Sequence, residues 1–305
     1  MSPVSFMRVR TVIGALIAMF VLWGALGGEA LAGETGEVKR GILLVAFGSS
    51  VPEGQEAISA VEEAVKRAWP DTEVRLAFTS RIIMRKVARE QNRVIDEPAV
   101  ALAKMAYEGF THVAVLSTHI IPGAEYQDLE AVVDGFRSMR SRGTKAGFEY
   151  IGLSLPLLSN ANDFSRMAQT LTESYANEGR DGAVIFVGHG THHFSDAAYS
   201  ALQTSLRRIS PNFFVGTIEG MPSYDDVLAQ LRKTSGKKVT LVPAMLVAGD
   251  HAQNDIGGDE DDSWKSMLSK AGYSVTPKFL GLGQADAVQR LLIDKLREAW
   301  GDQAP

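Results

Sequence analysis

The chain has 305 residues, 45% of them hydrophobic, which is enough for one large α/β domain or two smaller ones with separate cores. Because it contains no cysteine, disulfides, thiolate zinc sites and cysteine nucleophiles are excluded, and any metal must be held by His, Asp or Glu. Its formal net charge of -5 at pH 7 argues against a nucleic-acid-binding surface, so no nucleic-acid partner is expected.

The N-terminus has the pattern of an export signal. Arginines precede an uncharged apolar stretch at residues 11–28, and an Ala-Leu-Ala triplet follows it as a small-x-small cleavage pattern. We therefore expect residues 1–32 to be a signal peptide cleaved after Ala32, residues 33–40 to be a polar linker, and the mature protein to be periplasmic. The alternative is an uncleaved membrane anchor, since the apolar stretch is nearly long enough to span a bilayer.

After the linker, strands and helices alternate along the first half of the chain. Continuous apolar runs, such as residues 41–47, are expected for strands that are buried on both faces of a sheet. The strands predicted in this series cover residues 41–47, 73–78, 112–121 and 148–155. Apolar residues at helical spacing predict the helices, at about residues 52–69, from 82, 98–108 and 122–139.

The same alternation then starts again. The predicted strands of this second series cover residues 182–190, 213–220, 237–251 and 273–283. The predicted helices cover about residues 162–176, 224–233, 263–270 and 285–300. Because such alternation implies parallel sheets, the predicted fold class is α/β, with two pseudo-symmetric halves. Each half is expected to be a four-stranded parallel sheet flanked by helices, at residues 41–160 and 161–305.

The two series can be laid on each other. Residues 43–50 parallel 184–191, residues 75–80 parallel 215–220, and residues 113–125 parallel 239–251. We expect Ser49 to be the counterpart of His189, Thr79 the counterpart of Glu219, and Glu125 the counterpart of His251. Ligands of open parallel sheets collect beyond the carboxyl ends of the strands, so these residues are expected to face a cleft between the halves. The reactive groups are expected on the C-terminal half, because Ser, Thr and Glu are a poorer set of metal ligands.

Two imidazoles and one carboxylate are the candidate metal ligands of that half: His189, Glu219 and His251. Such a set can bind a divalent ion with coordination positions left open, and it can move protons near neutral pH. The glycines that flank His189 allow a tight turn and the close approach of a flat ligand. Taken alone, the Gly-His-Gly tripeptide is equally consistent with a turn that holds an incidental histidine. Asp250 is a candidate to orient the imidazole of His251.

The remaining polar residues give weaker evidence for a functional site than the three candidate metal ligands do. His119 follows a first-half strand and either faces the same cleft or is a core histidine. Ser49 is not part of a G-x-S-x-G motif, so a hydrolase nucleophile is poorly supported. We expect His192 and His193 to open the helix after the turn. The acidic run at residues 259–262 is interpreted as a solvated loop in preference to a cation funnel.

These segments carry a resemblance to a known family. Residues 43–50, 117–126, 188–193 and 246–255 together resemble the anaerobic cobalt chelatases, the sirohydrochlorin cobaltochelatases. The resemblance covers essentially the whole chain from about Arg40, and the ordered set of motifs is far more specific than any one of them. It implies two pseudo-symmetric α/β halves related in fold to the ferrochelatases. It also implies insertion of Co²⁺ into sirohydrochlorin or precorrin-2, without ATP, on the way to cobalamin.

The resemblance also assigns roles to residues of this sequence. It implies that His189, Glu219 and His251 hold the metal, with His189 and Glu219 as the catalytic residues and His189 favoured as acceptor of the pyrrole protons. The residues expected to support the ligands or the substrate are Asp250, Ser49, Thr79, Glu125 and His119. Co²⁺, or alternatively Fe²⁺, is then a substrate, and no obligatory cofactor is expected. The expected partners are a tetrapyrrole, a divalent metal and further copies of the chain in a homo-oligomer.

Two rival hypotheses remain open. Members of the family are mostly cytoplasmic, so the export signal favours an exported tetrapyrrole- or metal-binding carrier built on a chelatase scaffold. The complete His/Glu/His set favours the enzyme. The third hypothesis is a metal-dependent hydrolase, which requires a water-activating site with no room for a macrocycle.

Overall fold

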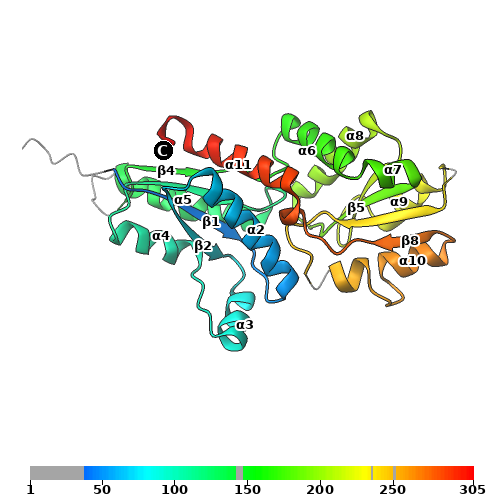
Figure 1. Ribbon diagram of the computed structural model, residues 1–305, viewed down its shortest axis with the longest axis horizontal. Coiled ribbons are helices and arrows are strands. Elements are labelled where there is room, and N and C mark those ends of the chain that lie inside the picture. Colours follow the sequence, from blue (N-terminus) through cyan, green and yellow to red (C-terminus); the bar gives the residue numbers. More distant parts are fainter. Residues whose placement is uncertain (1–37, 142–146, 235, 250–251) are drawn as a thin grey trace, which may run out of the picture. The chain divides into compact units, whose positions relative to one another are not determined.

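Two four-stranded parallel sheets form the framework of the chain (Figure 1). The computed structural model describes residues 38–141, 147–234, 236–249 and 252–305. The first sheet consists of β1 (Arg40–Ala46), β2 (Glu73–Phe78), β3 (His112–Ser117) and β4 (Tyr150–Leu153). The second consists of β5 (Ala183–Gly188), β6 (Phe213–Thr217), β7 (Lys238–Pro243) and β8 (Ser274–Pro277). This arrangement confirms the predicted fold class.

The two sheets share one topology. The strand order is β2-β1-β3-β4 in the first and β6-β5-β7-β8 in the second, and every pairing is parallel. All residues of β3 and β5 are buried, because neighbouring strands and helices cover them on every side. The edge strand β8 is half exposed. The predicted apolar runs therefore correspond to the central strands of each sheet.

Helices connect the strands in both halves. The first half contains α2 (Pro52–Ala68), α3 (Arg81–Gln91), α4 (Pro98–Tyr107) and α5 (Ala124–Ser141). The second series contains α6 (Ala161–Ser174), α7 (Ala176–Asp181), α8 (Ala197–Ile209), α9 (Tyr224–Leu231), α10 (Trp264–Lys270) and α11 (Asp286–Trp300). Short helical turns are η1 (Phe194–Asp196), η2 (Ala252–Ile256), η3 (Leu282–Gln284) and η4 (Gly301–Gln303). Within the described residues, no helix is both long enough and apolar enough to cross a bilayer.

The C-terminal helix α11 packs on the first sheet, although it follows the second sheet in sequence. The hydroxyl of Tyr150, in β4, donates a 2.6 Å hydrogen bond to the carbonyl of Ala299. Trp300 is fully buried and stacks on the Tyr150 ring, with 6.4 Å between the ring centroids. At Gly152 a side chain would collide with the Ala299 carbonyl, so this helix and β4 are in backbone contact.

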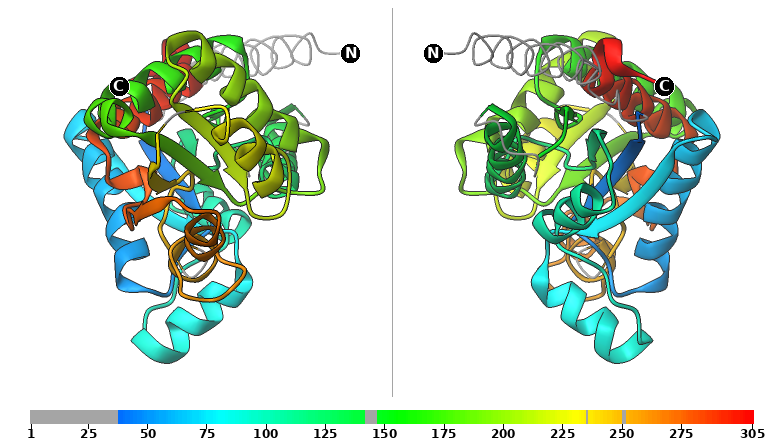
Figure 2. Two further views of the ribbon diagram at one scale, coloured as in Figure 1. Left: turned by 90° about the vertical axis from the view of Figure 1, so that its right-hand side faces the viewer. Right: turned by 90° about the vertical axis from the view of Figure 1, so that its left-hand side faces the viewer.

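One hydrophobic cluster consequently draws on both sheets. It contains Leu44 and Leu116 from the first sheet, Phe186 and Val242 from the second, and Leu296 from α11. The helix α11 also lies beside α6, as Figures 1 and 2 both show. The two halves therefore share part of their core, and the outer faces of the two sheets carry separate clusters.

Candidate functional site

His189 and Glu219 lie side by side where the adjacent strands β5 and β6 end. The amide of Glu219 donates a 2.8 Å hydrogen bond to the carbonyl of His189, which continues the ladder of the sheet past the strand ends. Their side chains approach to 4.0 Å, measured from Nδ1 to Oε2, and are 41% and 54% exposed. The structure thus brings together two of the three predicted metal ligands, and both are open to solvent.

One hydrogen bond of the His189 ring involves its Nδ1 nitrogen. Nδ1 lies 2.9 Å from the carbonyl oxygen of Gly190, which can only accept. In the neutral ring this hydrogen bond assigns the proton to Nδ1 and the lone pair to Nε2. Nε2 is then the nitrogen suited to bind a metal or to accept a proton.

The two glycines that flank His189 are required for different structural reasons. A side chain at Gly188 would collide with the ring of Tyr199, which packs beneath the turn. Gly190 has φ +82°, in the left-handed region, and a Cβ there would lie 2.5 Å from the amide nitrogen of Gly220. Burial raises the pKa of Tyr199 to about 12, so this phenol stays protonated at neutral pH. The predicted tight turn is confirmed, and at Gly190 its backbone lies against the loop of Glu219.

The third predicted ligand, His251, and its neighbour Asp250 lie outside the described residues. Among the residues that the structure does describe, no three His, Asp or Glu side chains come together as a metal site. The pair His189 and Glu219 is therefore the described part of the predicted set.

Hydrogen bonds between the strands give the true equivalence of the two halves. The bond from the Ser80 amide to the Phe47 carbonyl, 3.1 Å, matches the bond from Glu219 to His189. The counterpart of His189 is thus Phe47, and the counterpart of Glu219 is Ser80. The expected pairings with Ser49 and Thr79 were wrong, because overlaying sequence strings does not fix the register of the ladder.

Two further observations support this register. Gly48 has φ +105° and corresponds to Gly190, so the same left-handed turn follows β1 and β5. At the third strand the predicted equivalence is confirmed, since the amides of Thr118 and Ala244 bond the carbonyls of Val45 and Val187, respectively.

The predicted site residues Ser49 and Thr79 of the first half have buried hydroxyl groups. Ser49 is buried, and its Oγ accepts a 3.2 Å hydrogen bond from the Val51 amide at the start of α2. The hydroxyl of Thr79 is also buried, and it makes no hydrogen bond within the described part of the chain. Neither hydroxyl is presented to solvent as the carboxylate of Glu219 is.

His119 and Glu125 come together at the end of β3. Nδ1 of His119 is 2.8 Å from the Ser117 hydroxyl, and Nε2 is 3.7 Å from Oε2 of Glu125. The imidazole is 11% exposed and its Nε2 has no hydrogen-bond partner among the described residues, whereas the carboxylate is half exposed. The intervening loop meets η1 of the second half, since a Cβ on Gly123 would lie 3.6 Å from the Ser195 hydroxyl.

Large apolar side chains are exposed in the loops that follow the strands. Phe47 is 45% exposed, Met221 62% and Phe194 78%. Exposed apolar side chains can contribute to a ligand surface where they lie beside polar groups. The sequence analysis missed all three, although Phe47 could have been found as the last residue of the first apolar run.

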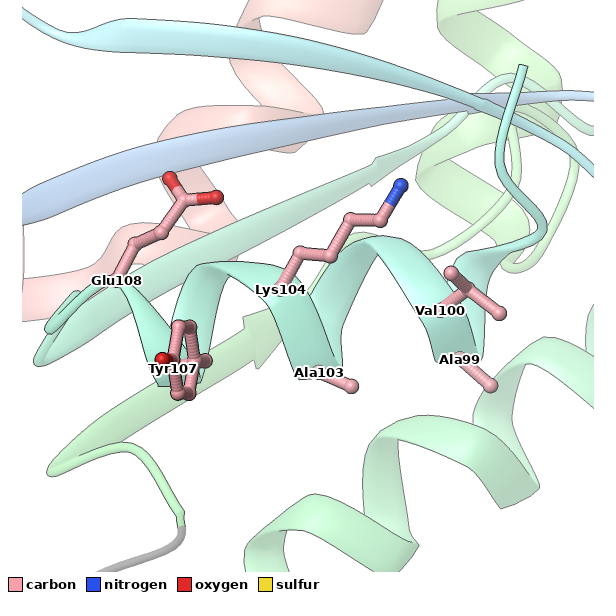
Figure 3. Close-up of a pocket in the computed structure, with 6 residues that line it drawn as sticks. All are labelled: Ala99, Val100, Ala103, Lys104, Tyr107 and Glu108. Carbon is pink, nitrogen blue, oxygen red and sulfur yellow. The ribbon is translucent and has the colours of Figure 1, made fainter. Parts of the chain in front are cut away.

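Two hollows of the surface lie on the first half of the chain. The larger, of about 430 Å³, is lined by Ala99, Val100, Ala103, Lys104, Tyr107 and Glu108 along one side of α4 (Figure 3). A second, of about 300 Å³, lies between α3 and the start of α4. Neither is lined by His189 or Glu219, so they do not bear on the chemistry at these two strand ends.

Comparisons with known proteins match nearly the whole chain to one family. The sequence profile of the family "Cobalt chelatase (CbiK)" matches residues 40–301. The chain is 37% identical over 279 residues to sirohydrochlorin cobaltochelatase CbiKC of Nitratidesulfovibrio vulgaris, covering 91% of this chain and 96% of that protein. It is 36% identical over 263 residues to a sirohydrochlorin cobaltochelatase of Salmonella typhimurium, covering 86% and 97%.

Solved structures show the same fold at low sequence identity. SirB from Bacillus subtilis with Fe³⁺ matches with a TM-score of 0.60 and 16% identity, covering 87% of this chain and 97% of that one. The sirohydrochlorin chelatase SirB from Bacillus subtilis subspecies spizizenii in complex with cobalt matches with a TM-score of 0.56 and 15% identity, covering 87% and 98%.

Proposed function

The chain belongs to the cobalt chelatase (CbiK) family, and from this premise we propose that it inserts Co²⁺ into sirohydrochlorin at the strand ends of its second half. It is a metal chelatase, with the tetrapyrrole and a divalent metal as its substrates. One observation carries the choice of residues: His189 and Glu219 stand 4.0 Å apart, solvent-exposed, on neighbouring strands. Within this proposal His251 supplies the third ligand and Asp250 orients it.

The chemistry requires an exchange of metal for protons. Co²⁺ arrives at His189 and Glu219, and the pyrrole N–H groups lose their protons as metal–nitrogen bonds form. Insertion of one Co²⁺ releases two pyrrole protons. Nε2 of His189 cannot hold the metal and a proton at once, so release of the metal to the ring leaves its lone pair to accept one proton, and the carboxylate of Glu219, freed in the same step, accepts the other. The hydrogen bond from Nδ1 to Gly190 keeps the ring orientation through both steps and stabilises the imidazolium.

No energy source is required in this scheme. Metal binding to a tetrapyrrole is itself favourable, so positioning and desolvation lower the barrier without ATP. Fe²⁺ and Co²⁺ differ only gradually in affinity for imidazole and carboxylate, so we propose Co²⁺ as the preferred metal and Fe²⁺ as an alternative substrate. No further cofactor is proposed.

The test is a multiple-turnover metallation assay, followed by the absorbance of sirohydrochlorin, with Co²⁺ and Fe²⁺ in parallel. His189→Ala is expected to lower the enzyme-dependent rate by about 10²-fold or more, the usual contribution of a positioned acid–base group. His192→Ala is the matched control, because His192 is exposed in the same loop, and it should keep the wild-type rate. Equal rates for His189→Ala and wild type would remove the assigned catalytic role.

The second candidate function is an exported carrier of tetrapyrrole or metal, which the export-signal pattern at residues 1–32 favours. A carrier binds stoichiometrically and releases slowly, whereas an enzyme metallates many equivalents of pigment. The same assay therefore separates the two. Product limited to one equivalent per chain supports the carrier.

We also propose that residues 1–32 are a signal peptide removed on export to the periplasm. These residues lie outside the described part of the structure, and the family match begins at residue 40. Expression of the full chain in a Gram-negative host, followed by fractionation and intact mass measurement, should give a periplasmic protein that begins at Gly33. An uncleaved chain in the membrane fraction would support the anchor instead.

A homo-oligomer is proposed as the assembled form. Outside the strand-end loops, Tyr107 is 94% exposed, Val94 85% and Ile82 76%, and large apolar side chains of this kind are commonly covered by a second subunit. Light scattering on the purified protein gives the mass directly, and a monomeric mass would contradict the proposal.

A further inference from the structure

We infer that Asp196 is a positioning residue that joins the loop of His189 to the loop of Glu219; the inference rests on the proposed function. Its carboxylate lies between the two loops. Oδ1 accepts a 3.0 Å hydrogen bond from the amide of Thr191, and Oδ2 accepts a 2.7 Å hydrogen bond from the amide of Met221. Thr191 lies two residues after His189, and Met221 lies two residues after Glu219.

The place of Asp196 in the chain makes this use of its side chain unusual. It ends η1 and directly precedes α8, at the N-cap position of that helix. An aspartate there ordinarily accepts a hydrogen bond from an amide of its own helix. Asp196 makes no such bond to α8. Its two carboxylate oxygens instead accept hydrogen bonds from the loops of His189 and Glu219. A residue that departs from its local role in this way points to a function elsewhere.

The carboxylate of Asp196 packs closely against the backbone of the Glu219 loop. A Cβ on Gly220 would lie 2.7 Å from Oδ2 and Cγ of Asp196, and a Cβ on Gly190 would lie 2.5 Å from the amide nitrogen of Gly220. Both loops are thus built from glycine where they meet. The carboxylate and the two backbones are in direct contact as one unit.

This arrangement closes a ring of hydrogen bonds around the ligand pair. On the strand side, the Glu219 amide bonds the His189 carbonyl at 2.8 Å. On the far side, the Asp196 carboxylate ties Thr191 to Met221. With both ends fixed, the backbones that carry His189 and Glu219 are held at a constant separation. A site held in this way does not need to be reorganised when the metal arrives.

Only a carboxylate suits this position. Both partners are N–H donors, so both oxygens must accept, whereas an asparagine would present an NH₂ group to one of the amides. Asp196→Asn therefore removes one of the two hydrogen bonds with almost no change in volume. Asp196→Glu retains both acceptors on a longer side chain.

The matched control is Asp226→Asn. Asp226 also accepts a backbone hydrogen bond at the start of a helix, 2.9 Å from the Ser223 amide, and a second one from the Ser223 hydroxyl at 2.7 Å. It belongs to the capping box of α9 and bonds Ser223, the residue before that helix, and among the described residues no hydrogen bond joins its side chain to the loop of His189. The same substitution in the two places therefore separates the general effect of an Asp→Asn change at a helix start from loss of the link between the ligand loops.

The experiment measures thermal unfolding, kcat and KM for Co²⁺ insertion into sirohydrochlorin, and the Kd for Co²⁺ alone, well below the unfolding temperature of each variant. For Asp196→Asn we expect kcat to fall and the Co²⁺ Kd to rise by about 10-fold to 100-fold, the usual effect of residues that orient metal ligands, with KM for the tetrapyrrole unchanged. Asp196→Glu should recover part of kcat. Asp226→Asn, whose carbonyl oxygen can replace Oδ2 as the acceptor, should keep the wild-type kcat and Co²⁺ Kd.

Wild-type kcat and Co²⁺ Kd in Asp196→Asn would overturn the inference, as would equal losses of activity in Asp196→Asn and Asp226→Asn. If Asp196→Asn does not fold, Asp196→Glu carries the test through its own kcat and Co²⁺ Kd. The proposed function fails separately, when His189→Ala keeps the metallation rate. In that case the Co²⁺ Kd of the Asp196 variants still reports whether the two loops form one metal site.

Discussion

Single residues at the end of β5 determine how the site is shaped, and Gly190 gives the sharpest case. Its φ of +82° and its contact with the Gly220 amide both exclude a side chain. Gly190→Ala is expected to lower the free energy of unfolding by about 1–3 kcal/mol, the usual cost of a strained backbone position, and to lower kcat because His189 must move. Chemical denaturation and the metallation assay measure the two effects.

The control for this change is Gly135→Ala, within α5. A Cβ there has nothing within 4 Å, and alanine is the better helix former, so this variant should gain about 0.5–1 kcal/mol. A Gly190→Ala variant as stable as Gly135→Ala would show that the turn tolerates a side chain.

The residues of the site could be predicted only in part. His189 and Glu219 were found because each follows an apolar run at a strand end. Phe47 was missed as the counterpart of His189, because its position depends on hydrogen bonds beyond the strand ends. Asp196 could not be predicted, since an aspartate before a helix reads as an ordinary cap.

At the scale of the elements, strands were predicted well at their starts and poorly at their ends. The runs at 112–121 and 237–251 were expected to be strands throughout, but β3 ends at Ser117 and β7 at Pro243. The apolar residues after them, such as Ile120 and Val247, pack against the core from loops. Apolar composition alone therefore cannot distinguish a buried loop from the continuation of a strand.

The contact between α6 and α11 supplies the prediction at this scale. Lys295 of α11 and Asp163 of α6 form a 2.7 Å ion pair, and their side chains are only 3% and 4% exposed. Asp163→Ala removes the buried partner of this ammonium and leaves only Glu298, which is 57% exposed and 3.6 Å away, so we expect a loss of about 3 kcal/mol in the free energy of unfolding. Denaturant titration at neutral pH measures it.

The comparison variant for the buried pair is Glu62→Ala, which breaks the surface pair of Glu62 with Lys66 in α2. Because that pair is solvent-exposed, the expected change is about 0–1 kcal/mol. Similar losses in the two variants would mean that the burial of the α6–α11 pair has no energetic consequence.

At the scale of the whole molecule, the shared core predicts cooperative unfolding. Leu44 and Phe186 belong to one cluster, although they lie in different sheets. Amides of β3 and β7 should therefore exchange with solvent through the same global opening, with equal free energies of protection. Hydrogen–deuterium exchange by mass spectrometry compares the two strands directly. Protection that differs between them by several kcal/mol would show that the halves open independently.

The repeated order of strands and helices in the sequence predicted two similar halves, and the structure confirms them. The sequence did not predict on which sheet α11 packs. Its apolar residues, such as Leu292 and Leu296, recur at helical spacing and would suit the face of either sheet. What selects the first sheet is Gly152, whose missing side chain admits the helix backbone, and this becomes visible only once β4 and α11 are in contact.

The position of α11 has a consequence for biosynthesis. Because α11 comes after β1–β8 in sequence, Tyr150 and the apolar face of β3 and β4 stay uncovered during translation until α11 has been made. Folding from the N-terminus can build the strands of the first sheet early, but it cannot close that half before residues 286–300 emerge from the ribosome. A nascent chain that stops a few residues short of Trp300 leaves this face open to chaperones, proteases and aggregation.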